Sequence, residues 1–247
     1  MKFEDNFSAQ SRQYARFRPQ YPDGLYAYLA SLAPERSLVW DCGTGSGQAA
    51  VSLAKHFVRV YATDASTEQI AHAYPHEKVE YHVENAEHVG LASGSTDLVT
   101  VAQAVNGFDF EKFHAEVKRV LKPGGVLALW TYGLPEISPR VYDALKRLYF
   151  DVLSGFWSER VRYVEEEYRT LPFPYEEIVP PAFVMDATWD RNQLMGFLDS
   201  WSGTQKYRQQ KGRHPLEEIW DEVVDDWKDE AEKRSVRWNL YFRIGRK

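Results

Sequence analysis

Residues 38–50 have the sequence Leu38-Val39-Trp40-Asp41-Cys42-Gly43-Thr44-Gly45-Ser46-Gly47-Gln48-Ala49-Ala50. An apolar strand runs into an acid, then into three alternating glycines, and then into residues that favour a helix. A tight turn at the end of a strand needs unusual φ/ψ angles, and a missing Cβ lets backbone N–H groups come close to a ligand. The stretch therefore predicts a strand–loop–helix unit whose loop cradles a small ligand.

The spacing of the glycines separates the candidate ligands. A dinucleotide loop has the pattern G-x-G-x-x-G and would need glycine or alanine at Gln48, which disfavours a nicotinamide-dependent oxidoreductase. A triphosphate loop would need a lysine and then Ser or Thr after Gly47, and the chain has neither there. The β-prone segment 58–63 ends on Asp64, about 20 residues after Gly43, where a carboxylate that holds the ribose hydroxyls is expected.

With this loop and this acid, the chain resembles the class I S-adenosylmethionine-dependent methyltransferases. Further matches to that family are Asn85-Ala86-Glu87, Ser95-Thr96-Asp97-Leu98-Val99 and Leu121-Lys122-Pro123-Gly124-Gly125, in this order. The resemblance covers most of the chain and implies an α/β fold. This fold is a Rossmann-like, doubly wound, mostly parallel seven-stranded sheet with an antiparallel last strand at its edge and a helical cap insertion.

The resemblance also implies S-adenosylmethionine as the cofactor and a set of cofactor-binding residues. Asp64 would hold the ribose, and an asparagine carbonyl at position 85 would accept from the adenine amino group. The set comprises Asp41, Gly43, Gly45, Gly47, Asp64, Ala65, Asn85, Ala86, Gln103, Tyr14 and Arg18.

Two further segments, 14–22 and 197–202, are similar to the subgroup that contains trans-aconitate methyltransferases. In such relatives the first segment folds over the cofactor, so residues 1–22 are expected to form a lid that carries Tyr14 and Arg18; a packed tyrosine and a solvated arginine remain alternatives. The subgroup commonly has histidine and tryptophan where this chain has Asn106 and Gly107. The missing imidazole removes a candidate base.

The composition sets limits on the remaining function classes. The chain has 247 residues, 44% of them apolar, which suits one large α/β domain. A formal charge of −6 argues against binding to nucleic acid or to an anionic membrane surface. A single cysteine, Cys42, and the lack of a long apolar run or signal peptide favour the reducing cytoplasm. No metal site is expected, because Pro75 separates His72 from His76. The oligomeric state stays open.

Hydrophobic periodicity predicts the other elements. Strands are expected at 79–83, 98–102, 126–132, 183–189 and 236–244, and helices follow the caps Ser66, Asp109, Ser138 and Asp190. Residues 136–181, rich in aromatic residues and proline, are expected to form the cap insertion of a single domain, 1–247. Their aromatic side chains either pack a core or line an acceptor pocket.

Methyl transfer from a sulfonium is an in-line displacement and needs few catalytic side chains, so none is assigned. The acids nearest in sequence, Glu87 and Asp97, are expected to be structural. A small-molecule acceptor is expected. The candidate is a carboxylate that is methylated on oxygen and oriented by Arg18 or Arg208, since such an acceptor needs no general base. A nicotinamide-dependent oxidoreductase and a non-catalytic S-adenosylmethionine-binding protein are the alternatives.

Overall fold

The computed structural model describes residues 18–247, in which eight strands form one open sheet in the order β3-β2-β1-β4-β5-β8-β6, with β7 paired to β8. The first five strands pair parallel, and β8 runs antiparallel to β5, β6 and β7. The strands are β1 (Leu38–Cys42), β2 (Arg59–Asp64), β3 (Val79–Val83), β4 (Thr96–Ala102), β5 (Leu121–Tyr132), β6 (Glu176–Glu177), β7 (Val184–Trp189) and β8 (Arg234–Arg246).

This topology confirms the predicted Rossmann-like, mostly parallel sheet with an antiparallel last strand. Two details differ from the expectation. The sheet has one strand more than seven, because the two-residue strand β6 pairs with β8 within a segment where no strand was expected. The last strand is also not an edge strand, since β8 lies between β5 and β6 and continues along β7.

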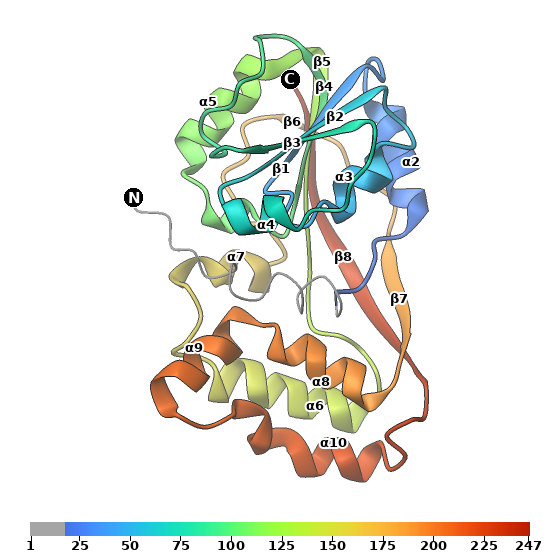
Figure 1. Ribbon diagram of the computed structural model, residues 1–247, viewed down its shortest axis with the longest axis vertical. Helices are drawn as coiled ribbons and strands as arrows, with labels where there is room; N and C mark the ends of the chain where they lie inside the picture. Colours follow the sequence, from blue (N-terminus) through green and yellow to red (C-terminus); the bar gives the residue numbers. More distant parts are fainter. Residues whose placement is uncertain (1–17) are drawn as a thin grey trace.

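Helices cover both faces of the sheet, with α5 on one side and α2 and α3 on the other (Figure 1). Alternate residues of β5 therefore enter two cores: Trp130 packs in the core that includes α2, and Leu129 packs in the core of α5. Burial on both faces explains why these strands are almost continuously apolar. The α-helices are α2 (Asp23–Leu32), α3 (Gln48–Leu53), α4 (Thr67–Ala71), α5 (Phe110–Val120), α6 (Pro139–Lys146), α7 (Arg162–Glu165), α8 (Arg191–Asp199), α9 (Ser202–Lys211) and α10 (Trp220–Asp226).

The predicted helix starts are present at their capping residues. Asp109 accepts from the backbone of Lys112 at the start of α5, and Asp190 forms a reciprocal capping box with Gln193 at the start of α8. Pro139 occupies the first turn of α6 after its cap, Ser138. Polar caps of this kind are local signals, which is why the sequence locates these ends well.

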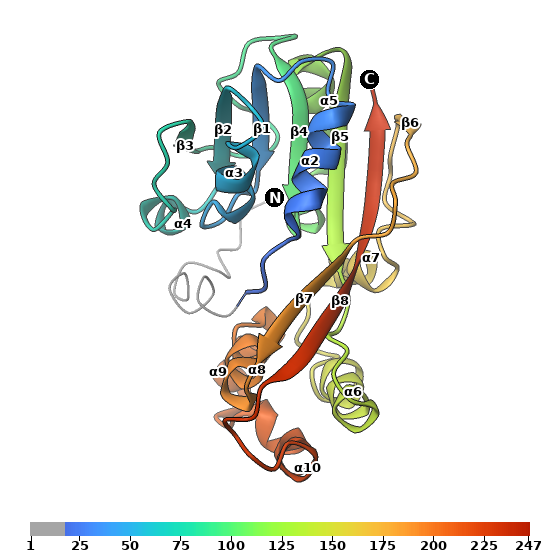
Figure 2. The same ribbon diagram turned by 90° about the vertical axis from the view of Figure 1, so that its right-hand side faces the viewer.

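A second group of helices lies beyond one end of the sheet. Figure 2 shows α6, α8, α9 and α10 together at the far ends of β7 and β8, and the arrowheads of β4 and β5 point toward them. This helical lobe draws on residues 139–152 and on residues 191–227. Its apolar side chains continue the core that contains Trp130. The carboxyl ends of the parallel strands therefore face the lobe, and ligands of open α/β sheets bind outside those ends.

No helix within residues 18–247 has both the length and the apolar content needed to cross a membrane.

Candidate functional site

The loop after β1 needs its glycines for two different reasons. Gly43, Gly45 and Gly47 all have positive φ, at 67°, 56° and 84°. A Cβ on Gly43 would lie 2.5 Å from the Cβ of Ala104, and a Cβ on Gly47 would collide with the phenol of Tyr81. Among residues 18–247, none would lie closer than 4.0 Å to a Cβ on Gly45. Protein neighbours therefore require glycine at positions 43 and 47, whereas Gly45 has open space beside it within the described part of the chain.

Asp64 joins this loop to the end of β2. One carboxylate oxygen accepts from the backbone N–H of Gly45 at 2.9 Å, and the other accepts from the N–H of Ser66 at 2.9 Å. The side chain is only half-buried. Each oxygen of a carboxylate can accept more than one hydrogen bond, which is the chemistry needed to hold the two hydroxyls of a ribose.

Asp41 lies beneath the same loop and is almost completely buried. Its two oxygens accept from the hydroxyls of Thr44 and Thr100 at 2.6 and 2.7 Å. Burial raises the pKa of Asp41 to about 6, and the neighbouring charge of Asp64 acts in the same direction. Both carboxyl oxygens of Asp41 are therefore hydrogen-bonded to hydroxyl groups of the protein itself, beneath the glycine loop.

Gln103, at the end of β4, has a positive φ of 57°. Its backbone N–H donates to Trp130, its side-chain amide donates to the carbonyl of Tyr132, and its side-chain oxygen accepts from Thr131. These contacts with β5 hold a backbone conformation that is uncommon for a residue other than glycine.

Residues 18–21 cross in front of the loop. Pro19 accepts through its carbonyl from the side chain of Gln48 at 2.9 Å, which ties the segment to α3. Arg18 donates to the phenol of Tyr132 at 2.6 Å, and its guanidinium lies 5.3 Å from the ring centre of Phe197 on α8. Arg18 therefore contacts both the carboxyl end of β5, through Tyr132, and the helical lobe, through Phe197. Tyr14 lies outside the described residues.

The turn after β3 lies beside the end of β2, because the backbone N–H of Glu84 donates to the carbonyl of Asp64 at 3.1 Å. Asn85 is exposed, Ala86 is buried, and Asn85 forms a bridge with His88. Asp64, Ala65, Asn85 and Ala86 therefore lie at two adjoining strand ends.

One pocket collects several of the predicted residues, namely Arg18, Asp41, Gly43, Gly45 and Gln103. Gly47, Asp64, Ala65, Asn85 and Ala86 do not line it. The other lining residues were not predicted from the sequence as site residues. Tyr132 could have been predicted, because it is the last residue of a parallel strand and ligands bind at those ends. Tyr74 has no such signal in the sequence. The other lining residues are Pro19, Gln20, Tyr21, Thr44, Ser46, Gln48, Ala49, Tyr74, Ala102 and Tyr132.

The other acids and the second arginine considered from the sequence lie elsewhere. Asp97 accepts from two backbone N–H groups at the start of β1 and pairs with Lys122, and Glu87 accepts from the N–H of Asp109. Both are structural, as expected. Arg208 pairs with Asp199 and does not line the pocket.

Within residues 18–247, the structure favours neither a nicotinamide-dependent reaction nor a metal site. Tyr142 and Lys146 have the Tyr-x-x-x-Lys spacing used by some nicotinamide-dependent enzymes, but they lie on α6 in the helical lobe, where Lys146 pairs with Asp143. No group of three or more His, Cys, Asp or Glu side chains in the described part of the chain is placed to hold a metal ion.

Comparison with known proteins gives one consistent result. Residues 40–129 match a family model described as a methyltransferase domain. A Dictyostelium discoideum protein named as a methyltransferase is 33% identical over 255 residues, which is 100% of this chain and 96% of that protein. A methyltransferase of Aspergillus candidus is 28% identical over 65% of this chain and 59% of its own length.

A solved structure extends the similarity to three dimensions. The structure of an Anaeromyxobacter dehalogenans protein described as a type II methyltransferase superposes with a TM-score of 0.86 and 40% identity, covering 93% of this chain and 97% of that one. The identity and the near-complete coverage go well beyond a shared fold. The chain therefore belongs to the class I S-adenosylmethionine-dependent methyltransferases.

Proposed function

We propose that this methyltransferase transfers the methyl group of S-adenosylmethionine to a carboxylate oxygen of a small molecule. The observation that carries the proposal is the charge of the pocket. Among the described lining residues, Arg18 is the one cation, and Asp41, buried under the loop, is the one acid. Neither histidine nor lysine is among them. Such a pocket suits an acceptor that is already anionic, because a neutral amine or alcohol would need a base.

The placement proposed for the cofactor follows the order of the strand ends. Asp64 holds the ribose hydroxyls at the end of β2, and the neighbouring turn at Asn85 and Ala86 meets the adenine. The methionine part then lies over the glycine loop, where Gly45 leaves open space, and extends toward Gln103. The residues fit such a molecule, since a half-buried acid, exposed backbone and a polar pocket follow one another across β2, β1 and β4.

The acceptor is proposed to lie between the sheet and α8. Arg18 can hold a carboxylate with two parallel hydrogen bonds, and the ring of Phe197 beside it excludes water. The resemblance of segments 14–22 and 197–202 to the trans-aconitate methyltransferase subgroup supports an acid as the acceptor. Holding the two reactants in line can itself supply roughly 7–11 kcal/mol of the rate enhancement. A cytoplasmic location stays a prediction.

Incubation with labelled S-adenosylmethionine and parallel panels of carboxylic acids, phenols and amines tests the proposal. With the carboxylic acids, the labelled products should be methyl esters, which alkali hydrolyses. Label found only in alkali-stable ethers or methylamines would contradict carboxylate methylation.

The role of Arg18 is tested with Arg18→Lys, which keeps the charge but loses the planar fork. The Michaelis constant for the acid should rise about tenfold while the dissociation constant of S-adenosylhomocysteine stays unchanged, because a bidentate contact is worth roughly 1.4 kcal/mol or more. The matched control is Arg208→Lys, which alters an arginine outside the pocket. Weakened S-adenosylhomocysteine binding with an unchanged Michaelis constant for the acid would assign Arg18 to the cofactor's own carboxylate.

A further inference from the structure

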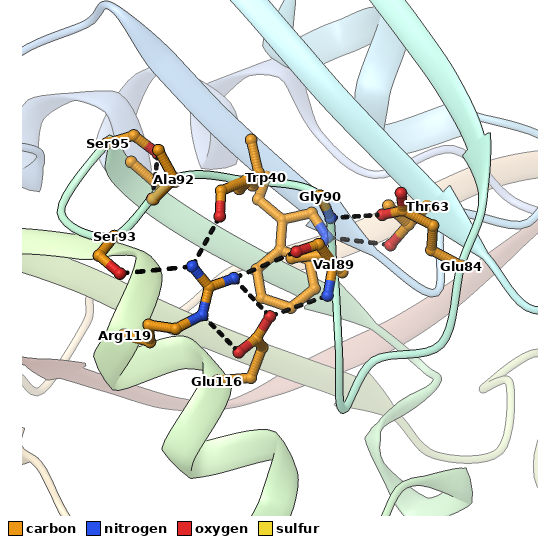
Figure 3. Close-up of polar contacts among 12 residues, drawn as sticks. Trp40, Thr63, Glu84, Val89, Gly90, Ala92, Ser93, Ser95, Glu116 and Arg119 are labelled. Atoms are coloured by element: carbon orange, nitrogen blue, oxygen red, sulfur yellow. Dashed lines mark hydrogen bonds and ion pairs between the residues drawn. The ribbon is translucent and has the colours of Figure 1, made fainter.

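The turn between β3 and β4 is fastened to α5 by two charged side chains that lie outside the pocket (Figure 3). Glu116 is 6% exposed, and its carboxylate accepts from the backbone N–H of Val89 at 2.8 Å. Arg119 meets both oxygens of the same carboxylate, at 2.6 and 2.7 Å. These hydrogen bonds hold the pKa of Glu116 below its usual value, so the pair is ionised at neutral pH.

Arg119 also binds the backbone of the turn. Its guanidinium donates to the carbonyl of Leu91 at 2.7 Å and to that of Val89 at 3.1 Å, and its own carbonyl accepts from Gly94 at 2.9 Å. Figure 3 shows the guanidinium between Glu116 and this backbone. The pair thus fixes the segment that leads from the turn into β4.

The other end of the turn is closed by Glu84. Its two oxygens accept from the phenol of Tyr61 at 2.9 Å and from the backbone N–H of Gly90 at 3.2 Å. Its own N–H donates to the carbonyl of Asp64. Residues 85–88 therefore lie between the contacts of Glu84 on one side and those of Glu116 and Arg119 on the other, directly beside Asp64.

We propose that Glu116 and Arg119 are positioning residues that set the affinity for the nucleoside end of the cofactor by fixing residues 85–88. The inference rests on the proposed placement of ribose at Asp64 and adenine at the turn. A base linked to a ribose at Asp64 can extend along the strand ends to this turn, and a loop already held in its binding conformation loses less conformational entropy when the ligand binds. Residues that touch no ligand can change such affinities through the contacts that they hold.

Two conservative variants test the role. In Glu116→Gln, an NH2 group replaces one carboxylate oxygen. This group must face either the backbone N–H of Val89 or the guanidinium of Arg119, and neither of these can accept a hydrogen bond from it. Arg119→Lys keeps the charge but cannot reach the carboxylate and both carbonyls with one fork. In calorimetry, each variant should bind S-adenosylhomocysteine about three- to tenfold more weakly. Binding of S-ribosylhomocysteine, which lacks adenine and is measured by displacement, should not change.

Arg191→Lys is the matched control, because Arg191 also donates to a backbone carbonyl, that of Trp227, and pairs with an acid, Glu230, but lies in the helical lobe. It should leave both affinities unchanged. If both α5 variants fail to fold, Glu84→Gln is used instead, because it weakens the contacts of Glu84 with Tyr61 and Gly90 at the other end of the turn. It should show the same selective loss of affinity for S-adenosylhomocysteine.

Equal loss for the two ligands, or no loss for either, would overturn the positioning role and leave Glu116 and Arg119 as structural residues only. A parent protein that binds S-ribosylhomocysteine as tightly as S-adenosylhomocysteine would also overturn it, since adenine would then contribute nothing. A parent protein that binds neither ligand would instead count against the proposed cofactor placement, so the two failures are distinguishable.

Discussion

Asp64 is bound to the glycine loop and is also the proposed acceptor for the ribose hydroxyls. Its carboxylate accepts from the N–H groups of Gly45 and Ser66, so an alanine there would disturb the loop as well as remove the proposed acceptor. Asp64→Asn is the milder change, because it keeps one oxygen acceptor for the loop, while its NH2 group replaces the acceptor of Gly45 or of Ser66. It should weaken S-adenosylhomocysteine binding by about 1.5–3 kcal/mol, since hydrogen bonds to a charged group are lost. Calorimetry measures the difference against Glu80→Gln, an exposed acid on the neighbouring strand. If the two variants bound S-adenosylhomocysteine equally tightly, Asp64 would not be part of the cofactor site.

Gly45 is predicted to be needed for the ligand more than for the fold. Gly45 and Gly212 have similar positive φ, 56° and 68°, and within residues 18–247 neither has a neighbour closer than 4.0 Å for a Cβ. Alanine at either position should therefore cost about 1–2 kcal/mol of stability from the left-handed backbone alone. Gly45→Ala should also lose affinity for S-adenosylhomocysteine, whereas Gly212→Ala, at the end of α9, should not. Parallel losses of stability and unchanged affinity in both variants would show that the loop is only a turn.

Asp41 gives the protein a defined pH dependence. Its folded pKa is about 6, above the usual value near 3.8, so the folded state binds this proton more tightly than the unfolded state does. Its contribution to stability is therefore largest below about pH 4 and falls as the pH rises to about 6.

Asp41→Asn cannot ionise and should lack this fall. The free energy of unfolding of the variant, relative to the parent, should rise by about 2 kcal/mol between pH 4.5 and 7.5 in urea titrations. Asp143→Asn, at a side chain that is 71% exposed, is the control. A constant difference across this range would contradict the burial argument.

At the scale of elements, α9 is seated by an aromatic contact. A Cβ on Gly203 would lie 2.9 Å from the ring of Trp157, which also packs on Tyr149 and Trp201. Gly203→Ala should therefore destabilise the fold by about 1–3 kcal/mol through overpacking. Gly155→Ala is the control, because no described residue lies within 4 Å of a Cβ at that position. Urea unfolding compares the two, and similar midpoints would show that the lobe adapts without cost.

Elements with a local signal were predicted from the sequence, and elements defined by distant pairing were not. Strict alternation from Val236 to Ile244 and the polar caps of α5 and α8 located those elements. The two residues of β6, Glu176 and Glu177, carry no periodicity and become a strand only because β8 runs beside them. For the same reason, nothing local showed that β8 lies inside the sheet.

The candidate site divides in the same way. The spacing of a strand–loop–helix unit predicted the glycines, Asp41 and Asp64 as candidates, and the structure places Asp41, Gly43 and Gly45 at one pocket. Tyr74 joins the pocket because its N–H donates to the carbonyl of Ser46, and Glu116 and Arg119 act on a turn that is distant in sequence. Contacts of this kind depend on tertiary packing and leave no motif in the chain.

At the scale of the whole molecule, the site lies where the carboxyl ends of the parallel strands face the helical lobe. Strands β7 and β8 pair along the connection between the sheet and the lobe (Figure 2). Arg18 contacts both parts, through Tyr132 at the end of β5 and Phe197 on α8. In the proposed arrangement, the sheet supplies the cofactor surface, and the lobe supplies the wall on the acceptor side.

Binding of S-adenosylhomocysteine to the unmodified protein, measured by calorimetry beside NAD⁺, tests the central claim most directly. The account predicts one molecule of S-adenosylhomocysteine bound per chain and no binding of NAD⁺. At a ligand concentration of about one hundred times the dissociation constant, the folded state should gain about 2.7 kcal/mol. Binding of NAD⁺ with no binding of S-adenosylhomocysteine would contradict the assignment of the glycine loop and of Asp64.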